Sequence, residues 1–361
     1  MDALLEKAVE EPESLTQGDL AALLRFSDGS ALFAAALSVK ERTIGRRVSL
    51  RGLVEFSNRC VWNCLYCGIR ADNRTVSRYR LDADEIIACA ARAKALGYGN
   101  LVLQSGETPA LSDFVEDVLC RLHCEFGVDF GITLSCGEQS DETYRRWFEA
   151  GAHRYLLRIE TSSPELYARL HPSEQSWRAR RDCLRSLGRL GYQLGTGTMS
   201  ALPGQSEDDR AADILFFRDE GADMIGMGPY IPHPDTPMGR GLDWTPSARA
   251  AALDQGLRMV AVTRLALPDV NIAASTALEA LDPEGRAKGL LAGANVIMPN
   301  VSPPSRRADY RLYAGKPGVD EGADEARERL ARSLAAIGET PLWDSRGDSL
   351  RFARRQEGNE R

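Results

Sequence analysis

Three cysteines stand close together early in the chain, in the run SNRCVWNCLYCGIR. Three residues separate Cys60 from Cys64, and two separate Cys64 from Cys67. Thiolates at this spacing can bind three irons of a cubane 4Fe–4S cluster, which ordinarily takes four cysteines. The fourth iron then keeps an open position that can bind and polarise a small molecule, as an open catalytic metal site does. The pattern therefore indicates catalysis rather than storage or simple electron transfer.

Zinc and a disulfide are the two simpler uses of these cysteines. A structural zinc site usually takes four ligands in paired motifs, but the sequence has no second CxxC and the nearest histidine is His123. A disulfide would leave one of the three cysteines unpaired, and nothing else in the sequence suggests secretion. Spacing and context favour the cluster over both alternatives.

Composition limits the class of protein. The chain has 361 residues, of which 43% are hydrophobic and 27% charged, as expected for a soluble globular protein with a full core. A net charge of −7 argues against nucleic acid as a main partner. The acidic N-terminus is not a signal peptide, and no stretch approaches the ~20 apolar residues that a membrane span needs. We expect a cytoplasmic protein with no nucleic-acid or membrane partner.

The elements that must position the cysteines alternate along the chain. Helical periodicity occurs at 81–99, where Asp82 is a candidate cap, and at 140–151, 208–221 and 247–266. Strand-like segments lie near 51–56, 100–104, 129–134, 154–159, 193–199, 223–227, 270–274 and 294–298. Eight such units predict an α/β fold of the TIM type, a (βα)8 barrel. An open doubly wound sheet is the alternative, but no GxGxxG opens the first helix.

The predicted barrel is flanked by two other segments. Residues 1–48 read as an N-terminal helical extension that caps the barrel, and residues 49–318 as the barrel itself. Residues 319–361 read as a C-terminal closing helix, centred on 321–338, followed by a polar tail that we expect to be frayed.

Polar residues gather where the predicted strands end. The cysteines follow the first strand, and similar polar runs end the next four, at 104–107, 133–138, 158–161 and 198–199. In TIM-type barrels the chemistry lies at this edge, because the βα loops meet there. These residues therefore predict the mouth of the barrel.

Several segments in this order resemble the HydE-type radical S-adenosylmethionine (SAM) maturases of FeFe-hydrogenases. They are RYRLDADEII, LVLQSGE, ITLSCGE, AGAHRYLLRIET, GTGTMSALPGQ, MIGMGPYIPHPDTPM and GANVIMPN, and they span almost the whole chain. The resemblance implies two cofactors, one 4Fe–4S cluster on Cys60, Cys64 and Cys67, and SAM chelated to its open iron.

The resemblance also implies residues that contact SAM: Ser105, Gly106, Glu107, Glu160, Arg180 and Met199. Each has a plainer interpretation. A strand-to-helix turn would also use Ser105-Gly106-Glu107, Glu160 can form a salt bridge to Arg158, and Met199 can be a core residue. Arg178 and Arg181 lie close to Arg180 in the sequence. An error of one residue in matching this segment to the family would therefore assign the SAM contact to the wrong arginine.

Residues that the resemblance assigns to the substrate cavity are Gln104, Thr133, Ser135, Arg158, Ser275, Thr276, Met298, Tyr310 and Tyr313. For His233 and Asp235, in a proline-rich run, we favour a structural role. Cys89, Cys120, Cys124 and Cys183 lie in helix-like stretches and are expected to be packed thiols. Cys136 is the spare cysteine that can face the cavity. No cysteine follows Cys183, so we predict no C-terminal second cluster.

The activity implied is reductive cleavage of SAM to a 5′-deoxyadenosyl radical, acting on a cysteine-bound iron carbonyl–cyanide precursor of the hydrogenase H-cluster. The implied partners are a small-molecule or organometallic substrate, an electron donor, and other hydrogenase maturases that would make transient contact. One rival is a methylornithine synthase-like radical SAM mutase, which would clamp an amino acid. A rival of another class is a non-catalytic iron–sulfur or zinc scaffold.

Overall fold

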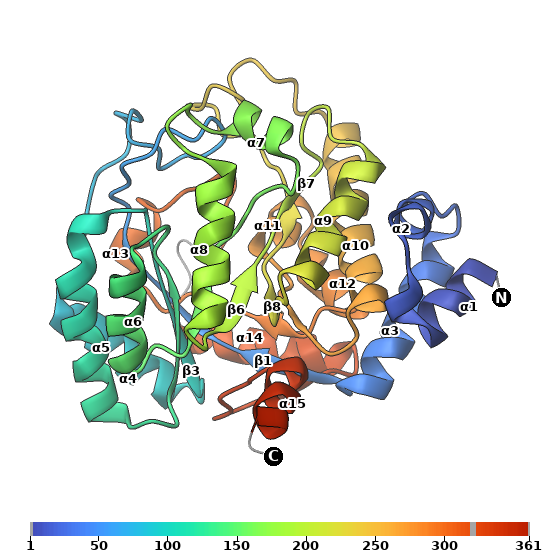
Figure 1. Cartoon of the computed structure of the whole chain (residues 1–361). Coiled ribbons are helices and arrows are strands. Elements are labelled where there is room, and N and C mark those ends of the chain that lie inside the picture. The colour runs from blue at the N-terminus through green and yellow to red at the C-terminus, as the bar shows by residue number, and fades with distance from the viewer. Residues whose placement is uncertain (1–2, 318–322, 360–361) are drawn as a thin grey trace.

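A curled sheet of seven parallel strands forms the centre of the computed structural model, which describes residues 3–317 and 323–359 (Figure 1). Every neighbouring pair in it is parallel. In spatial order the strands are β2 (Gly52–Ser57), β3 (Asn100–Ser105), β4 (Gly131–Ser135), β5 (Arg154–Leu156), β6 (Gln193–Thr196), β8 (Met224–Ile225) and β10 (Asn271–Ile272).

An eighth segment lies between the two edges of this sheet. Strand β11 (Val296–Ile297) makes a single parallel bridge from Val296 to Ala273 beyond β10. A second single bridge joins Asn300 to Leu53 in β2. The architecture is thus close to a partial TIM-type barrel, and all eight segments predicted as strands contain one.

Helices follow the strands and cover the outside of the sheet, as βα units require (Figure 1). They are α4 (Ala83–Ala95), α5 (Ser112–Phe126), α6 (Asp141–Glu149), α7 (Pro164–Leu170), α8 (Trp177–Arg189), α9 (Glu207–Asp219), α10 (Pro246–Ala266), α11 (Thr276–Leu281), α12 (Gly285–Leu291) and α13 (Pro304–Arg307). Short 3-10 turns occur at η1 (Pro12–Ser14) and η2 (Pro109–Leu111).

Helix ends follow the local chemistry that the sequence predicts. The Asp82 side chain accepts a hydrogen bond from the Glu85 N–H at 2.8 Å, and the Glu85 carboxylate accepts from the Asp82 N–H at the same distance. This capping box starts α4. At the other end Gly97 has a φ of 77°, a conformation that favours glycine and ends the helix.

Helices α1 (Ala3–Glu10), α2 (Gln17–Leu24) and α3 (Gly29–Thr43) lie at one side, where α3 packs against α10 and α2 against α9 (Figure 1). The sequence does not signal β1 (Arg47–Leu50), which pairs with β11, or the short sheet of β7 (Met199–Ser200) and β9 (Gly228–Pro229).

The C-terminal part is more ordered than the frayed tail that we expected. Helix α14 (Ala323–Ala336) agrees with the predicted closing helix, although 321–322 lie outside the described residues. Strand β12 (Thr340–Leu342) then pairs with β1, and α15 (Leu350–Asn359) lies at the bottom of the molecule (Figure 1). The tail prediction was wrong because Gly347 and Asp348 accept hydrogen bonds from side chains at the amino ends of the strands.

Candidate active site

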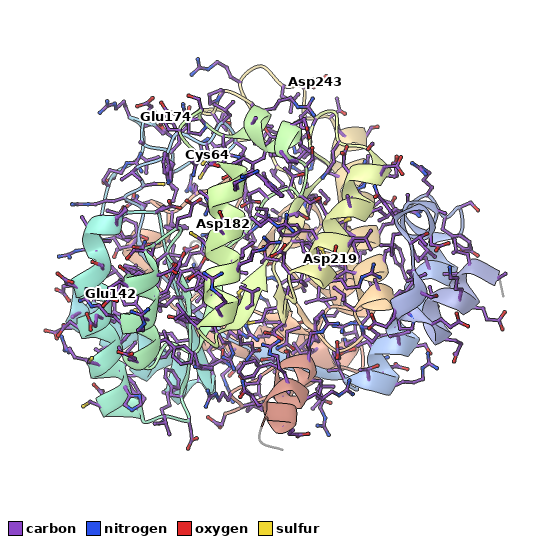
Figure 2. All side chains as sticks on the ribbon, viewed as in Figure 1. Cys64, Glu142, Glu174, Asp182, Asp219 and Asp243 are labelled. Carbon is purple, nitrogen blue, oxygen red and sulfur yellow. The ribbon has the colours of Figure 1, made fainter. Side chains whose placement is uncertain are left out.

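The three cysteines lie in the long loop between β2 and α4, and Cys64 is near the end of the molecule opposite α15 (Figure 2). All three are partly exposed. Burial raises the pKa of Cys67 to about 12, and Cys60 adds to this increase. Burial also raises the pKa of Cys64, with further increases from Cys67 and Cys60. The three sulfurs therefore share one partly buried site and would repel one another as free thiolates.

Backbone groups favour negative charge on these sulfurs. Hydrogen bonds from the backbone of Trp62 and Glu107 lower the pKa of Cys60 against the larger effect of burial. The backbone of Ile69 acts in the same direction on Cys67. Three converging thiols with amide donors fit a cluster that presents several irons, each taking one thiolate. Among the described residues, no three His, Cys, Asp or Glu side chains are grouped to bind a single metal ion.

Arg78 holds this loop in shape, a role that no sequence motif signals. Its Nη1 donates to the carbonyl oxygens of Asn58 at 2.7 Å and Ile69 at 2.8 Å. Its Nη2 donates to those of Ala71 at 3.3 Å and Asn73 at 3.2 Å. One guanidinium thus ties together the backbone on both sides of the cysteines.

A cavity of about 320 Å³ opens beside the cysteine loop, inside the curl of the sheet. Cys64 is not part of its lining; its Sγ lies 3.3 Å from Gln175 Oε1. Sixteen residues predicted from the sequence line it: Cys60, Cys67, Gln104, Ser105, Gly106, Glu107, Ser135, Arg158, Glu160, Arg180, Met199, Ser275, Thr276, Met298, Tyr310 and Tyr313.

Thr133 lies one layer deeper than the other predicted substrate residues. It lines a smaller adjoining cavity of about 30 Å³ together with Arg51 and Met224. Thr133 and Ser135 are two residues apart on β4, so their side chains share a face of the sheet. Ser135 reaches the larger cavity because it is nearer the carboxyl end of the strand.

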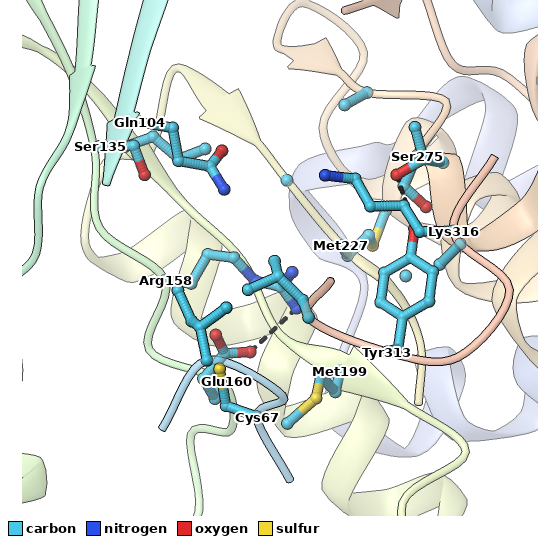
Figure 3. Close-up of a pocket in the computed structure, with 18 of the residues that line it drawn as sticks. Cys67, Gln104, Ser135, Arg158, Glu160, Met199, Met227, Ser275, Tyr313 and Lys316 are labelled. Atoms are coloured by element: carbon cyan, nitrogen blue, oxygen red, sulfur yellow. Dashed lines mark hydrogen bonds and ion pairs between the residues drawn. The ribbon is translucent and has the colours of Figure 1, made fainter. Parts of the chain in front are cut away.

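Glu160 combines an unusual backbone conformation with a partly buried charge. Its φ is 66°, a left-handed value that costs a residue other than glycine about 1–3 kcal/mol. Its Oε2 pairs with Nη2 of Arg158 at 2.9 Å, which is the salt bridge that the plainer interpretation of Glu160 predicts (Figure 3). Burial raises the pKa of Glu160, while Arg158 and Arg180 lower it. Strain and a shifted pKa in one side chain make this carboxylate a candidate functional group.

Arg180 is the inward-facing member of its arginine run. It is 8% exposed and lies 2.9 Å from Glu138 through Nε and 3.4 Å from Glu107 through Nη1. Arg181 instead pairs with Glu220 at 2.6 Å, outside the cavity lining, and Arg178 is exposed. Of these three arginines, Arg180 is the one that lines the cavity.

A second charged pair lies in the cavity, and the sequence does not predict it. Lys316 contacts the carboxylate of Glu55, and both residues line the cavity. Glu55 lies inside an apolar strand, and Lys316 is more than 250 residues away in the chain. No local pattern could connect them.

The remaining candidates lie outside the cavity. The Nδ1 of His233 accepts from the Asp235 N–H at 3.2 Å and orders its own loop, as favoured from the sequence. Cys136 is buried in the core rather than facing the cavity. Cys120 and Cys124 are exposed, so the prediction that they are packed was wrong. They lie on the outer face of α5, whereas Cys89 is buried.

No helix among the described residues is long and apolar enough to cross a membrane.

Comparison with known proteins agrees with this geometry. A model of the radical SAM superfamily matches residues 54–217. The FeFe hydrogenase maturase subunit HydE of Thermotoga maritima is 41% identical over 345 residues, which cover 94% of this chain and 95% of that protein. A 3-methylornithine synthase of Methanosarcina acetivorans is 28% identical over 304 residues, covering 82% of each.

Solved structures show the same fold. A methylornithine synthase superposes with a TM-score of 0.81 at 26% identity, covering 94% of this chain and 98% of that one. The FeFe-hydrogenase maturase HydG of Carboxydothermus hydrogenoformans gives 0.76 at 19% identity, covering 94% and 79%, which shows the fold alone. The identity to HydE over nearly the full length of both proteins decides the family. The chain belongs to the HydE family of FeFe-hydrogenase maturases, within the radical SAM superfamily.

Proposed function

We propose that this protein reductively cleaves SAM at a 4Fe–4S cluster and acts in assembly of the diiron site of the FeFe-hydrogenase H-cluster, on a cysteine-bound iron carbonyl–cyanide precursor. The observation that carries the proposal is the position of the cysteine loop at the edge of a cavity lined by the strained, partly buried Glu160. Identity of 41% to HydE supports the choice of pathway.

Cys60, Cys64 and Cys67 would each bind one iron, and Ser105, Gly106, Glu107, Glu160, Arg180 and Met199 would contact SAM. When bound, these cofactors supply a 5′-deoxyadenosyl radical. Gly106 suits a close approach, because a Cβ there would lie 2.8 Å from Cys60 Cβ and 2.4 Å from the Arg59 oxygen. Arg180 would keep two carboxylates paired until SAM presents its own.

The rest of the cavity would hold the substrate and exclude water from it. Apolar Met298 and hydroxyl-bearing Ser275 lie on its walls, and the Tyr313 hydroxyl donates to Thr276 Oγ1 at 2.7 Å. Gln104 donates to the Tyr310 hydroxyl at 3.2 Å. These groups, with Thr133, Ser135 and Arg158, would orient the precursor so that its reacting atom faces the cysteine loop.

The wider organisation belongs to the same proposal. The fold we infer is a (βα)8 barrel over residues 49–318, with residues 1–48 as a helical cap and 319–361 as a closing segment. The bridges from Val296 to Ala273 and from Asn300 to Leu53 support the eighth unit of this barrel. We place the protein in the cytoplasm, where an electron donor and the other maturases would contact it transiently.

The test is release of 5′-deoxyadenosine by anaerobically reconstituted protein with SAM and a strong reductant, with and without the cysteine-ligated iron complex. Release should rise with the complex and vanish when Cys60, Cys64 and Cys67 are replaced by serine. The TM-score of 0.81 to methylornithine synthase favours an amino-acid mutase as the second candidate. Release that ignores the complex but rises with an amino acid would support that candidate. A loaded cluster that releases nothing would support a scaffold.

A further inference from the structure

Two buried charges face each other in the cavity wall away from the cysteine loop. The side chain of Lys316 is 7% exposed and that of Glu55 2% exposed. The Lys316 ammonium donates to Glu55 Oε1 and to the Tyr310 carbonyl oxygen at 2.9 Å, and it lies 5.0 Å from the centre of the Tyr310 ring. Asn300 donates to the second oxygen of Glu55 at 2.9 Å. The pair is therefore held rigidly from both sides.

One N–H of this ammonium has no acceptor among the described residues. A lysine ammonium carries three donors. Two of them are used by Glu55 and Tyr310. The amine of Lys316 points into the cavity, towards the amide of Gln104 (Figure 3). The third N–H is thus available to a ligand in a nearly dry site, where a charged donor is strong.

The groups around Lys316 are also suited to an acceptor. The Tyr310 hydroxyl accepts from Gln104 at 3.2 Å, which leaves its own proton available. Ser275 Oγ is buried and has no hydrogen-bond partner in the part of the chain that the structure describes. An anion placed here would receive several donors together.

Stability alone gives a poor account of this pair. Removing two charges from water costs several kcal/mol per ion, and apolar residues of similar size are often as stabilising or more so. The pair also borders a cavity instead of closing a packed core. The buried charge of Lys316 is better explained by a ligand that binds to it.

We propose that Lys316, oriented by Glu55, binds the carboxylate of the amino-acid part of the substrate. This inference rests on the proposed function for the identity of that substrate. Cys67, Glu160 and Met199 lie at one end of the cavity, and Lys316 and Ser275 at the other (Figure 3). A carboxylate anchored at Lys316 leaves the rest of the substrate pointing towards the cysteine loop.

The test compares two ligands by calorimetry on the reconstituted, SAM-loaded protein: the cysteine-ligated iron carbonyl–cyanide complex and its cysteamine counterpart, which lacks the carboxylate. The wild type should bind the cysteine complex at least about tenfold more tightly, the effect of one charge-assisted hydrogen bond. Glu55→Gln with Lys316→Met should remove this preference, and Lys316→Arg should keep part of it. Lys288→Met is the control, since Lys288 pairs with Asp282 away from the cavity.

The double substitution is chosen because Lys316→Met alone would leave Glu55 buried without a cation and destabilise the fold. A double variant that melts like the wild type and still prefers the cysteine complex would overturn the inference. If the wild type binds neither iron complex, the proposed function fails instead. The comparison of L-ornithine with putrescine, its decarboxylated amine, then decides the role of Lys316 in the same variants.

Discussion

At the residue scale, the cavity contains two carboxylate–cation pairs with different signals in the sequence. Glu160 and Arg158 belong to one strand end, and their spacing already suggested the 2.9 Å contact. Glu55 and Lys316 meet only because the segment after α13 returns over β2. Residue spacing predicts contacts between neighbours at one strand end. It carries no information about an ion pair between residues that are far apart in the sequence.

Glu160→Gln tests the role of the strained carboxylate. Because Glu160 lies in the cavity beside the cysteine loop, loss of its charge should weaken SAM binding about tenfold, the usual effect of losing one charged hydrogen bond. The iron content should equal that of the wild type, since Glu160 is not one of the three proposed cluster ligands. Equilibrium dialysis with labelled SAM measures the change, and Glu165→Gln on the exposed face of α7 is the control. Unchanged SAM affinity would leave the ion pair with Arg158 as its only role.

The cysteine loop was largely predictable and its support was not. Thiol spacing predicts Cys60, Cys64 and Cys67 as the cluster ligands, because a 4Fe–4S cluster takes cysteine thiolates. The support comes from Arg78, which donates to backbone carbonyls. Any residue offers a carbonyl, so such contacts leave no pattern of residue types.

At the element scale, strands and helices were predictable because burial imposes their periods. Strand β2 is buried at every position, as its apolar run suggests, and α4 begins at its predicted cap. The strands β7 and β9 have only two residues each, too few for any period to appear.

Helix α9 supports the loop after Glu160 through a buried carboxyl group. Asp213 is fully buried, and its Oδ1 accepts from the Ser162 N–H at 2.6 Å. Burial raises the pKa of Asp213 from 3.8 to about 7, against the hydrogen bonds from Ser162. Between these values the unfolded chain has lost the proton that the folded protein keeps. The free energy of unfolding should therefore fall as pH rises from about 4 to about 7.

Asp213→Asn should remove this dependence, because the amide does not titrate. In the wild type, the titration of Asp213 should lower the free energy of unfolding by at most about 4 kcal/mol. This figure follows from about 1.4 kcal/mol for each unit by which the pKa is shifted. Urea unfolding under anaerobic conditions measures this pH dependence. It is carried out at several pH values between roughly 4.5 and 8, the range in which Asp213 titrates. Asp182→Asn, at an exposed position on α8, is the control. A pH dependence equal in the wild type and Asp213→Asn would show that other groups cause it.

At the scale of the whole molecule, one C-terminal loop ties together the amino ends of the strands. The Gly347 oxygen accepts from Arg51 at 3.1 Å and from Asn271 at 3.0 Å. Asp348 accepts from Arg154 at 2.5 Å and from Gln193 at 2.8 Å. The loop thereby links four strands at the end opposite the cysteine loop: the start of β2, together with β5, β6 and β10. Polar composition suggested a frayed tail, but here the polar groups satisfy buried strand ends.

Asp348→Ala should therefore act as a core mutation although it lies in a loop. The Arg154 side chain is fully buried, and Asp348 is the carboxylate that compensates its charge. Breaking a buried pair by removing one partner costs about 3–5 kcal/mol, and we expect about 3 because the Asp348 side chain is 29% exposed. Chemical unfolding measures the loss, with Asp219→Asn as a control whose side chain is 65% exposed. Since the loop joins both halves of the sheet, unfolding should remain one transition. A stable variant, or one in which the halves of the sheet unfold separately, would show that the barrel closes without this loop.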